Sequence, residues 1–190
     1  MRVISGTARG KKLKAPPGFI TRPLTDRIKE ALFNVLGGEI EDARLLDVFA
    51  GSGQVGIEAL SRGASYVVFV EKHPAAIRTI YANLDGCRFA SGFEVLGMDV
   101  FRALRILVGR GKVFDVIYVD PPFDQPEIFV QVLQALDNNR LLAERGTLVI
   151  RVPRKHALPE RLAFIAQFRI DVYGESALIY YRQREREEEL

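Results

Sequence analysis

The stretch VIYVDPPF (residues 116–123) decides the fold, because an apolar run stops there at a carboxylate, two prolines and an aromatic ring. A buried strand that ends in a polar turn is typical of the carboxyl edge of an α/β sheet, where such folds bind ligands. The prolines have fixed φ and restrict the residues before them, so the Asp120 carboxylate and the Pro121 carbonyl are held in set directions. Taken alone, the stretch is equally consistent with a proline-rich turn that places Phe123 in the core.

Both oxygen groups are hydrogen-bond acceptors only, and an exocyclic amino group of a nucleobase offers two N–H donors to match them. Phe123 supplies a flat face on which a base can stack. We therefore expect the catalytic site to consist of Asp120, Pro121, Pro122 and Phe123. This chemistry suits any exocyclic amine and does not by itself choose between guanine, adenine and cytosine.

Strands and helices alternate on both sides of this stretch. Strand-like runs at 45–49, 66–70, 93–96, 114–119 and 147–152 alternate with helical patterns at 55–62, from 74, at 100–108 and at 126–136. This succession predicts an α/β fold with a mostly parallel sheet and helices on both faces. Two further runs, 168–173 and 177–181, are joined by a short turn and predict a C-terminal antiparallel hairpin.

The first part of the chain has a different pattern. Residues 2–15 predict a short β-hairpin, and a helix is expected to begin near Thr25 or Asp26 and to end at the glycines 37–38. We therefore divide the chain into a basic hairpin extension, residues 1–24, and a main domain, residues 25–190.

A glycine-rich loop, DVFAGSGQVG (residues 47–56), follows the first strand of the alternating part. Gly51, Gly53 and Gly56 also match the G-x-G-x-x-G pattern of dinucleotide-binding loops. Two features argue against a dinucleotide. Asp47 would oppose a pyrophosphate, and the loop contains no basic residue. Asp47 instead suits the ammonium group of an amino-acid moiety.

Acidic residues also close the next two strands. Glu71 can accept hydrogen bonds from the hydroxyls of a ribose, and Asp99 can accept one from an adenine amino group. Taken singly, each is equally an ordinary loop acid, and Asp99 is equally a helix cap. Together with the loop, the acids predict a site for S-adenosylmethionine, which carries a sulfonium, an ammonium, a ribose and an adenine. The expected cofactor contacts are Asp47, Phe49, Gly51, Ser52, Gly53, Glu71, Lys72, Asp99 and Val100.

Composition limits the class of protein. Of 190 residues, 48% are hydrophobic and 27% charged, which is typical of a soluble globular domain. There is no apolar run of membrane-spanning length, and the first residues lack the apolar core of a signal peptide, so we expect a cytoplasmic protein. The single cysteine, Cys87, excludes an internal disulfide, and neither histidine has the spacing of a metal site or a catalytic triad. We expect no metal and a monomer.

Positive charge is concentrated at one end of the chain. Residues 1–30 contain eight Lys and Arg against two acidic residues, a net +6, whereas the whole chain has +3 and the remainder therefore −3. A basic region on a slightly acidic body favours a polyanionic partner, although a solvated surface hairpin is the simpler alternative. The expected RNA contacts are Arg2, Arg9, Lys11, Lys12, Arg22, Thr25 and Arg27.

In combination, these motifs resemble those of the RsmD-type methyltransferases. The likeness rests on DVFAGSG (47–53), GIEALSRGA (56–64) and DPPF (120–123), with ISG (4–6), RGKKL (9–13), RPLTDR (22–27), EALFN (30–34) and YGESA (173–177). The resemblance implies a Rossmann-like class I methyltransferase fold, with S-adenosylmethionine as the methyl donor. It further implies transfer to the exocyclic N2 of a guanine in bacterial small-subunit (16S) ribosomal RNA, as free RNA or in a 30S assembly particle. The N-terminal hairpin would help to hold that RNA.

Two other functions stay open from the residues alone. One is an adenine-N6 or cytosine-N4 methyltransferase acting on DNA or RNA, although the short chain has no obvious DNA target-recognition domain. The other is a non-catalytic RNA-binding factor in ribosome assembly, against which the intact DPPF stretch and glycine loop argue.

Overall fold

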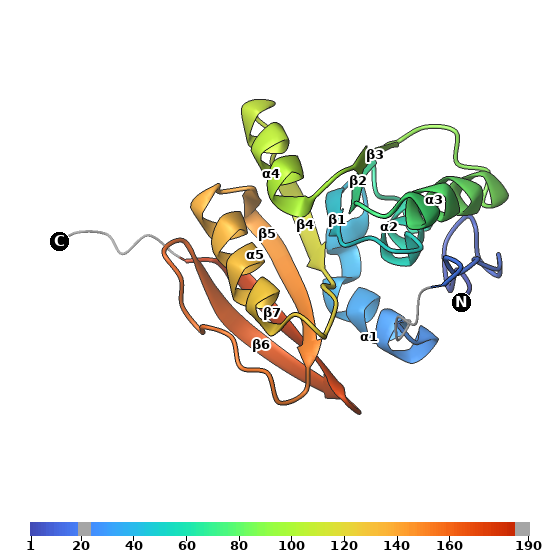
Figure 1. Cartoon of the computed structure of the whole chain (residues 1–190). Coiled ribbons are helices and arrows are strands. Elements are labelled where there is room, and N and C mark those ends of the chain that lie inside the picture. The colour runs from blue at the N-terminus through green and yellow to red at the C-terminus, as the bar shows by residue number, and fades with distance from the viewer. Residues whose placement is uncertain (19–23, 185–190) are drawn as a thin grey trace.

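A single sheet determines where the functional side chains lie. The computed structural model describes residues 1–18 and 24–184, and its seven-stranded sheet has the order β3-β2-β1-β4-β5-β7-β6 (Figure 1). The strands are β1 Arg44–Val48, β2 Tyr66–Glu71, β3 Phe93–Gly97, β4 Phe114–Val119, β5 Leu142–Pro153, β6 Ile165–Tyr173 and β7 Ser176–Gln183. Strands β1 to β5 are parallel, whereas β7 is antiparallel to both β5 and β6, which confirms the predicted sheet and its C-terminal hairpin.

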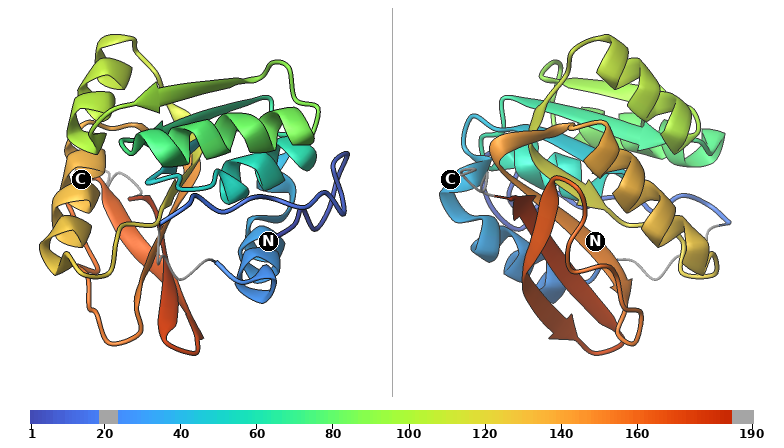
Figure 2. Two further views of the ribbon diagram at one scale, coloured as in Figure 1. Left: turned by 45° about the vertical axis from the view of Figure 1, so that its right-hand side comes forward. Right: turned by 90° about the vertical axis from the view of Figure 1, so that its left-hand side faces the viewer.

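Helices cover both faces of this sheet (Figure 2). They are α1 Asp26–Leu36, α2 Gln54–Ser61, α3 Pro74–Gly86, α4 Val100–Gly109 and α5 Pro126–Asn138, with a short 3-10 helix η1 at Gly37–Ile40 that was not predicted. Apolar side chains of α1, α2 and α3 form one core cluster with one face of the sheet. Those of α4 and α5 form a second cluster with the other face. Within the described part of the chain, no helix is long and apolar enough to cross a membrane.

The central strands read as apolar runs because both of their faces are covered. In β1, Leu45 belongs to the cluster with α1 to α3, and Leu46 to the cluster with α4 and α5. The register pairs Leu46 with Val68 of β2 and with Ile117 of β4. Because β1 lies between β2 and β4, the residues at the ends of these three strands come together at one edge.

The predicted N-terminal hairpin is a short antiparallel pairing. Arg2 and Lys12 form an isolated bridge, and the Val3 amide donates to the Lys11 carbonyl at 2.9 Å. Val3, Ala8 and Leu13 are buried in the same cluster as α1 to α3. These first residues therefore contribute to the core of the main sheet. The division of the chain at residue 24 stays a prediction.

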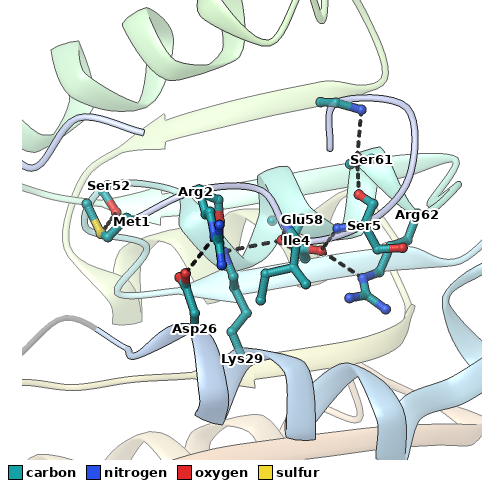
Figure 3. A network of polar contacts seen from close by, with 12 residues as sticks. Met1, Arg2, Ile4, Ser5, Asp26, Lys29, Ser52, Glu58, Ser61 and Arg62 are labelled. Atoms are coloured by element: carbon teal, nitrogen blue, oxygen red, sulfur yellow. Dashed lines mark hydrogen bonds and ion pairs between the residues drawn. The ribbon is translucent and has the colours of Figure 1, made fainter. Parts of the chain in front are cut away.

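A buried carboxylate holds this segment and α1 against α2 (Figure 3). Glu58 of α2 accepts hydrogen bonds from the backbone amides of Ile4 and Ser5, at 2.8 and 2.9 Å. It also pairs with Lys29 of α1 at 3.2 Å, and both of these side chains are fully buried. Arg62 forms a second ion pair with Glu58, at 2.9 Å. Lys29 therefore belongs to the net charge of residues 1–30 but does not contribute to the positive charge on the surface.

Gly6 packs against the backbone of Ser61, the last residue of α2. Gly6 has φ 82°, and a Cβ added there would lie 1.6 Å from the Ser61 carbonyl oxygen, so only glycine fits. The Ser61 carbonyl accepts from the Thr7 amide at 2.8 Å, and its hydroxyl accepts from the Ala8 amide at 2.9 Å. The first residues are thereby fixed in one position relative to α2.

Candidate active site

Four acidic residues lie at or next to the carboxyl ends of neighbouring parallel strands. Asp47 is the penultimate residue of β1, Glu71 is the last residue of β2, and Asp99 and Asp120 follow β3 and β4. The strand order places β1 between β2 and β4. The sheet therefore gathers the predicted cofactor acids and the predicted catalytic aspartate at one edge, where open α/β sheets bind ligands.

The glycine loop turns sharply between β1 and α2. Phe49 has φ 63°, Gly51 φ 57° and Gly53 φ 75°, so three positions in a five-residue span adopt the left-handed region. A non-glycine residue there costs roughly 1–2 kcal/mol, and such strain gathers at ligand sites. A Cβ at Gly51 would meet only the Phe49 carbonyl, at 4.0 Å, so the loop backbone is open to a ligand on that side.

The third glycine of the pattern has a packing role. A Cβ at Gly56 would lie 2.3 Å from the Phe69 ring, so this glycine lets α2 approach β2 closely. The Gly56 amide donates to Asp47 at 2.9 Å. The close packing of α2 on β2 therefore accounts for Gly56, and it does not distinguish between ligands, because the third glycine of a dinucleotide-binding loop has the same packing role.

Burial strongly changes the acidity of Asp47, whose side chain is nearly inaccessible. Burial raises the pKa of this carboxyl to about 8, against the lowering effect of the Gly56 hydrogen bond, and the charges of Asp120 and Glu71 raise it further. Asp47 therefore holds a proton in the free protein at neutral pH, and a cation bound beside it would favour the ionised form.

Glu71 ties the loop to the end of β2. Its carboxylate accepts backbone hydrogen bonds from Gly51 at 2.9 Å, Lys72 at 2.8 Å and His73 at 2.9 Å. A carboxylate has about four acceptor positions, so these three bonds leave room for about one further donor. The expected bonds to both hydroxyls of a ribose would require one of these backbone bonds to open.

The other expected cofactor contacts lie around the same edge. Asp99 is exposed and caps α4 by accepting a hydrogen bond from the Phe101 amide at 2.9 Å, which confirms the predicted role of Asp99 as a helix cap. The other predicted role of Asp99, as an acceptor for an adenine amino group, stays a prediction. The same holds for cofactor contacts of Lys72, which is exposed, and Val100, which is buried. Ser52 is buried, and its carbonyl accepts from the Asn83 side chain at 2.9 Å.

Asp120 begins the turn after β4, with 21% of its side chain exposed. Its Oδ2 accepts hydrogen bonds from Arg151 at 3.1 Å and from the Tyr118 hydroxyl at 3.3 Å. Among described residues, none donates to Oδ1 or to the Pro121 carbonyl. Both acceptors on which the sequence argument relied are thus present, with Pro121 buried and Pro122 exposed.

Phe123 is half-buried at the rim of this turn. Its ring lies 6.0 Å from that of Phe129 on α5, and the Arg151 guanidinium lies 5.2 Å from its centre. The ring therefore packs partly into the core, as expected for a proline-rich turn that places Phe123 there. The rest of its surface lies at the sheet edge beside Asp120.

Arg151 was not among the functional residues predicted from the sequence. This residue lies in β5 with 4% exposure, between Ile150 and Val152, which are fully buried. Buried arginines need partners, so a charged residue within the apolar run LVIRV was a signal that could have been followed. The sequence alone could not show that the partner would be Asp120.

The expected RNA contacts lie on the N-terminal segment and at the start of α1. Arg9, Lys11, Lys12 and Arg27 are exposed, and Arg2 pairs with Asp26 at 3.0 Å while keeping 66% of its side chain exposed. Thr25 caps α1 through a 3.3 Å hydrogen bond from the Ile28 amide. Arg22 lies outside the described residues.

Comparison with known proteins agrees with this geometry. Residues 1–182 match the family described as "Conserved hypothetical protein 95". The "Ribosomal RNA small subunit methyltransferase D" of Escherichia coli K12 is 34% identical over 183 residues, which cover 96% of this chain and 90% of that protein. The chain belongs to the RsmD family. A second relative in this family, "Putative rRNA methyltransferase YlbH" of Bacillus subtilis, is 38% identical over 97% of this chain and 100% of its own length.

A solved structure shares the fold along almost the whole chain. The "Putative methyltransferase yhhF from Escherichia coli" superposes with a TM-score of 0.82 at 34% identity, over 96% of this chain and 97% of that one. Together with the strand order, this neighbour confirms the class I methyltransferase fold that the resemblance implied. Among described residues there is no group of three or more His, Cys, Asp or Glu placed to hold a metal ion.

Proposed function

We propose that this protein transfers a methyl group from S-adenosylmethionine to the exocyclic N2 of a guanine in small-subunit ribosomal RNA. One observation carries the proposal. Two acceptors with no described donor, Asp120 Oδ1 and the Pro121 carbonyl, lie at the same sheet edge as the open glycine loop. An amine acceptor site beside a cofactor loop is what methylation of an exocyclic amine requires.

The chemistry of the carboxyl edge fits this cofactor. Asp47, Glu71 and Asp99 offer hydrogen-bond acceptors, and the loop backbone is open to a ligand at Gly51. When bound, S-adenosylmethionine supplies a methyl group activated by its positive sulfonium. Asp47 would stabilise the nearby positive charge, Glu71 would take a ribose hydroxyl, and Asp99 would take the adenine amino group.

Asp120 and the Pro121 carbonyl would accept the two N–H bonds of the guanine amine. This orients the nitrogen lone pair and stabilises the positive charge that develops on nitrogen as the methyl group arrives. An ordinary aspartate, with a pKa of about 3.9, is too weak a base to ionise a neutral arylamine beforehand. Burial raises the pKa of Asp120, which makes its carboxylate a better acceptor for the proton that the nitrogen loses once it has become cationic.

Two considerations support ribosomal RNA as the substrate. Both relatives named above are described as ribosomal RNA methyltransferases. The exposed Arg9, Lys11 and Lys12 suit phosphate contacts, which add affinity without sequence information. The target guanine must be unstacked, because its amino group cannot otherwise reach Asp120 and the Pro121 carbonyl.

Asp120→Asn tests the mechanism against a matched control on the same strand. The variant keeps the shape of the side chain but loses a charged acceptor, so we expect methyl transfer to fall at least about 100-fold. Cofactor affinity, measured by calorimetry, should stay within about twofold of wild type, since Asp120 is not among the expected cofactor contacts. Asp115→Asn changes an exposed carboxylate in β4 that pairs with Arg44 at 3.3 Å, and it should retain full activity. Unchanged transfer by Asp120→Asn would exclude the proposed role.

The base and the polymer are identified in the same assay. Labelled S-adenosylmethionine is incubated with 30S particles, naked small-subunit ribosomal RNA or duplex DNA, and the products are digested to nucleosides. N2-methylguanosine from either RNA substrate is the expected product. N6-methyladenosine or N4-methylcytidine, or their deoxy forms, would support the other methyltransferases, and no product with any substrate would support a non-catalytic factor.

A further inference from the structure

Arg151 connects the proposed amine site to the antiparallel end of the sheet. Its side chain, 5% exposed, donates from Nη1 to Asp120 Oδ2 at 3.1 Å and from Nη2 to the Ser176 hydroxyl at 3.2 Å. Asp120 follows β4, and Ser176 begins β7, so the guanidinium spans from one side of β5 to the other. A planar fork of this kind fixes two partners in one geometry better than a lysine ammonium does.

We infer that Arg151 is a positioning residue for the proposed methyl transfer, because it holds one oxygen of Asp120 and leaves the other for the amine. The inference rests on the proposed function of Asp120. The same guanidinium lies 5.2 Å from the centre of the Phe123 ring. Arg151 thus contacts both the acceptor, Asp120, and the aromatic ring against which the base would stack.

A purely structural role explains this placement less well. Hydrogen-bonded ladders already join β5 to both neighbours, with Val119 paired to Ile150 and Leu178 paired to Arg151. Buried ion pairs add little net stability compared with apolar residues of similar size. The strands therefore stay paired without the guanidinium. The Asp120 side chain, at the start of a turn, has the Tyr118 hydroxyl as its other described hydrogen-bond donor.

The charged groups around Asp120 come from four strands. Arg151 on β5 and the Tyr118 hydroxyl on β4 contact its carboxylate, and the carboxyls of Asp47 on β1 and Glu71 on β2 belong to the same edge. Burial raises the pKa of Asp120, while the charge and hydrogen bond of Arg151 lower it. Without Arg151, the carboxyl would be protonated over a wider pH range and would accept only weakly from an amine.

Kinetic measurements on Arg151→Met and Arg151→Lys test the inference. With small-subunit ribosomal RNA and saturating S-adenosylmethionine, Arg151→Met should lower kcat about 100-fold, the size expected when a reacting group is misplaced by about 1 Å. The KM for RNA and the cofactor affinity should stay within about twofold, and Arg151→Lys should recover part of kcat. The control is Arg182→Met, which removes another arginine of the same sheet, half-exposed and paired with Glu39 at 2.7 Å. Equal kcat losses in Arg151→Met and Arg182→Met would overturn the inference.

A titration of the free protein separates this inference from the proposed function. The side-chain carboxyl carbon of Asp120, assigned by its loss in Asp120→Asn, is followed by NMR as a function of pH. Its midpoint should move to higher pH in Arg151→Met and move less in Arg151→Lys. An unchanged midpoint would overturn the inference whatever the activity. If wild type methylates no RNA while the midpoint still moves, the proposed function fails and the contact of Arg151 with Asp120 stands.

Discussion

The sequence predicted where several candidate functional residues lie in the fold, but not which residues they contact. The alternation of strands and helices placed Asp47, Glu71, Asp99 and Asp120 at strand ends, because the carboxyl ends of parallel strands share an edge. Their partners could not be predicted, since pairs such as Asp120 with Arg151 join residues far apart in the chain. Lys29 was counted in the net charge of residues 1–30, but its burial against Glu58 of α2 removes that charge from the surface, which the sequence could not show.

The carboxyl of Asp47 gives a prediction for stability as a function of pH. Its pKa is raised from 3.8 to about 8 in the folded protein, so the folded state holds a proton that the unfolded state releases. The stabilising effect of that proton is complete below about pH 4 and is lost as the pH rises towards 8. In Asp47→Asn, the unfolding free energy measured in denaturant should fall less steeply between pH 5 and pH 8 than in wild type.

Asp115→Asn serves as the comparison for this slope. Hydrogen bonds from Arg44 lower the pKa of Asp115 despite its partial burial, so this carboxyl is ionised in both folded and unfolded states above pH 5. Its removal should shift the unfolding free energy by a constant amount over that range. A slope in Asp47→Asn identical to that of wild type would show that Asp47 does not titrate as described.

At the scale of elements, the predicted helices and strands agree with the structure where the apolar period is clear. Strand β5 is the main difference: it begins at Leu142, not near Thr147. The intervening residues include exposed Glu144 and Arg145, and the register with β4 shifts between Phe114 and Val116, so the polar interruption hid the strand. The helix η1 was missed because the glycines 37–38 read as a helix end.

The attachment of α1 and the N-terminal segment to α2 depends on Glu58. Glu58→Gln would leave the Lys29 ammonium buried without a counter-charge, and loss of one member of such a pair costs about 3–5 kcal/mol. We expect that decrease in the unfolding free energy measured with denaturant. The control is Asp26→Asn, which removes the exposed pair with Arg2 and should cost less than about 1 kcal/mol. A similar decrease in unfolding free energy in both variants would contradict the larger stabilising role given to the buried Lys29–Glu58 pair.

At the scale of the whole molecule, the two sides of the sheet differ. The N-terminal segment with Arg9, Lys11 and Lys12 shares a core with α1 to α3, whereas α4 and α5 cover the opposite face. Within the described residues, these three side chains form no ion pair, so they are available to phosphates. The concentration of charge was visible in the sequence, but its position relative to the sheet depends on contacts between distant residues, among them Gly6 with Ser61 and the Ile4 and Ser5 amides with Glu58.

Replacing Arg9, Lys11 and Lys12 together by alanine tests this surface. Each lost phosphate contact with single-stranded RNA should reduce the slope of log affinity against log salt by about 0.7, or about 2 for the three. Binding of small-subunit ribosomal RNA at several salt concentrations measures it. The control removes equal charge from the other side through Arg102, Arg105 and Lys112, which are exposed on or just after α4. A larger change in the control would place the RNA surface on the α4 side.

The position of β7 has a consequence for synthesis on the ribosome. The last strand along the chain is not at an edge but lies between β5 and β6, which both precede it. Until β7 has left the exit tunnel, the nascent chain presents the unpaired side of β5, with its apolar residues, and β6 has no neighbour. Chains that stall before residue 176 therefore cannot complete the sheet, and they carry an open strand edge suited to association with other chains.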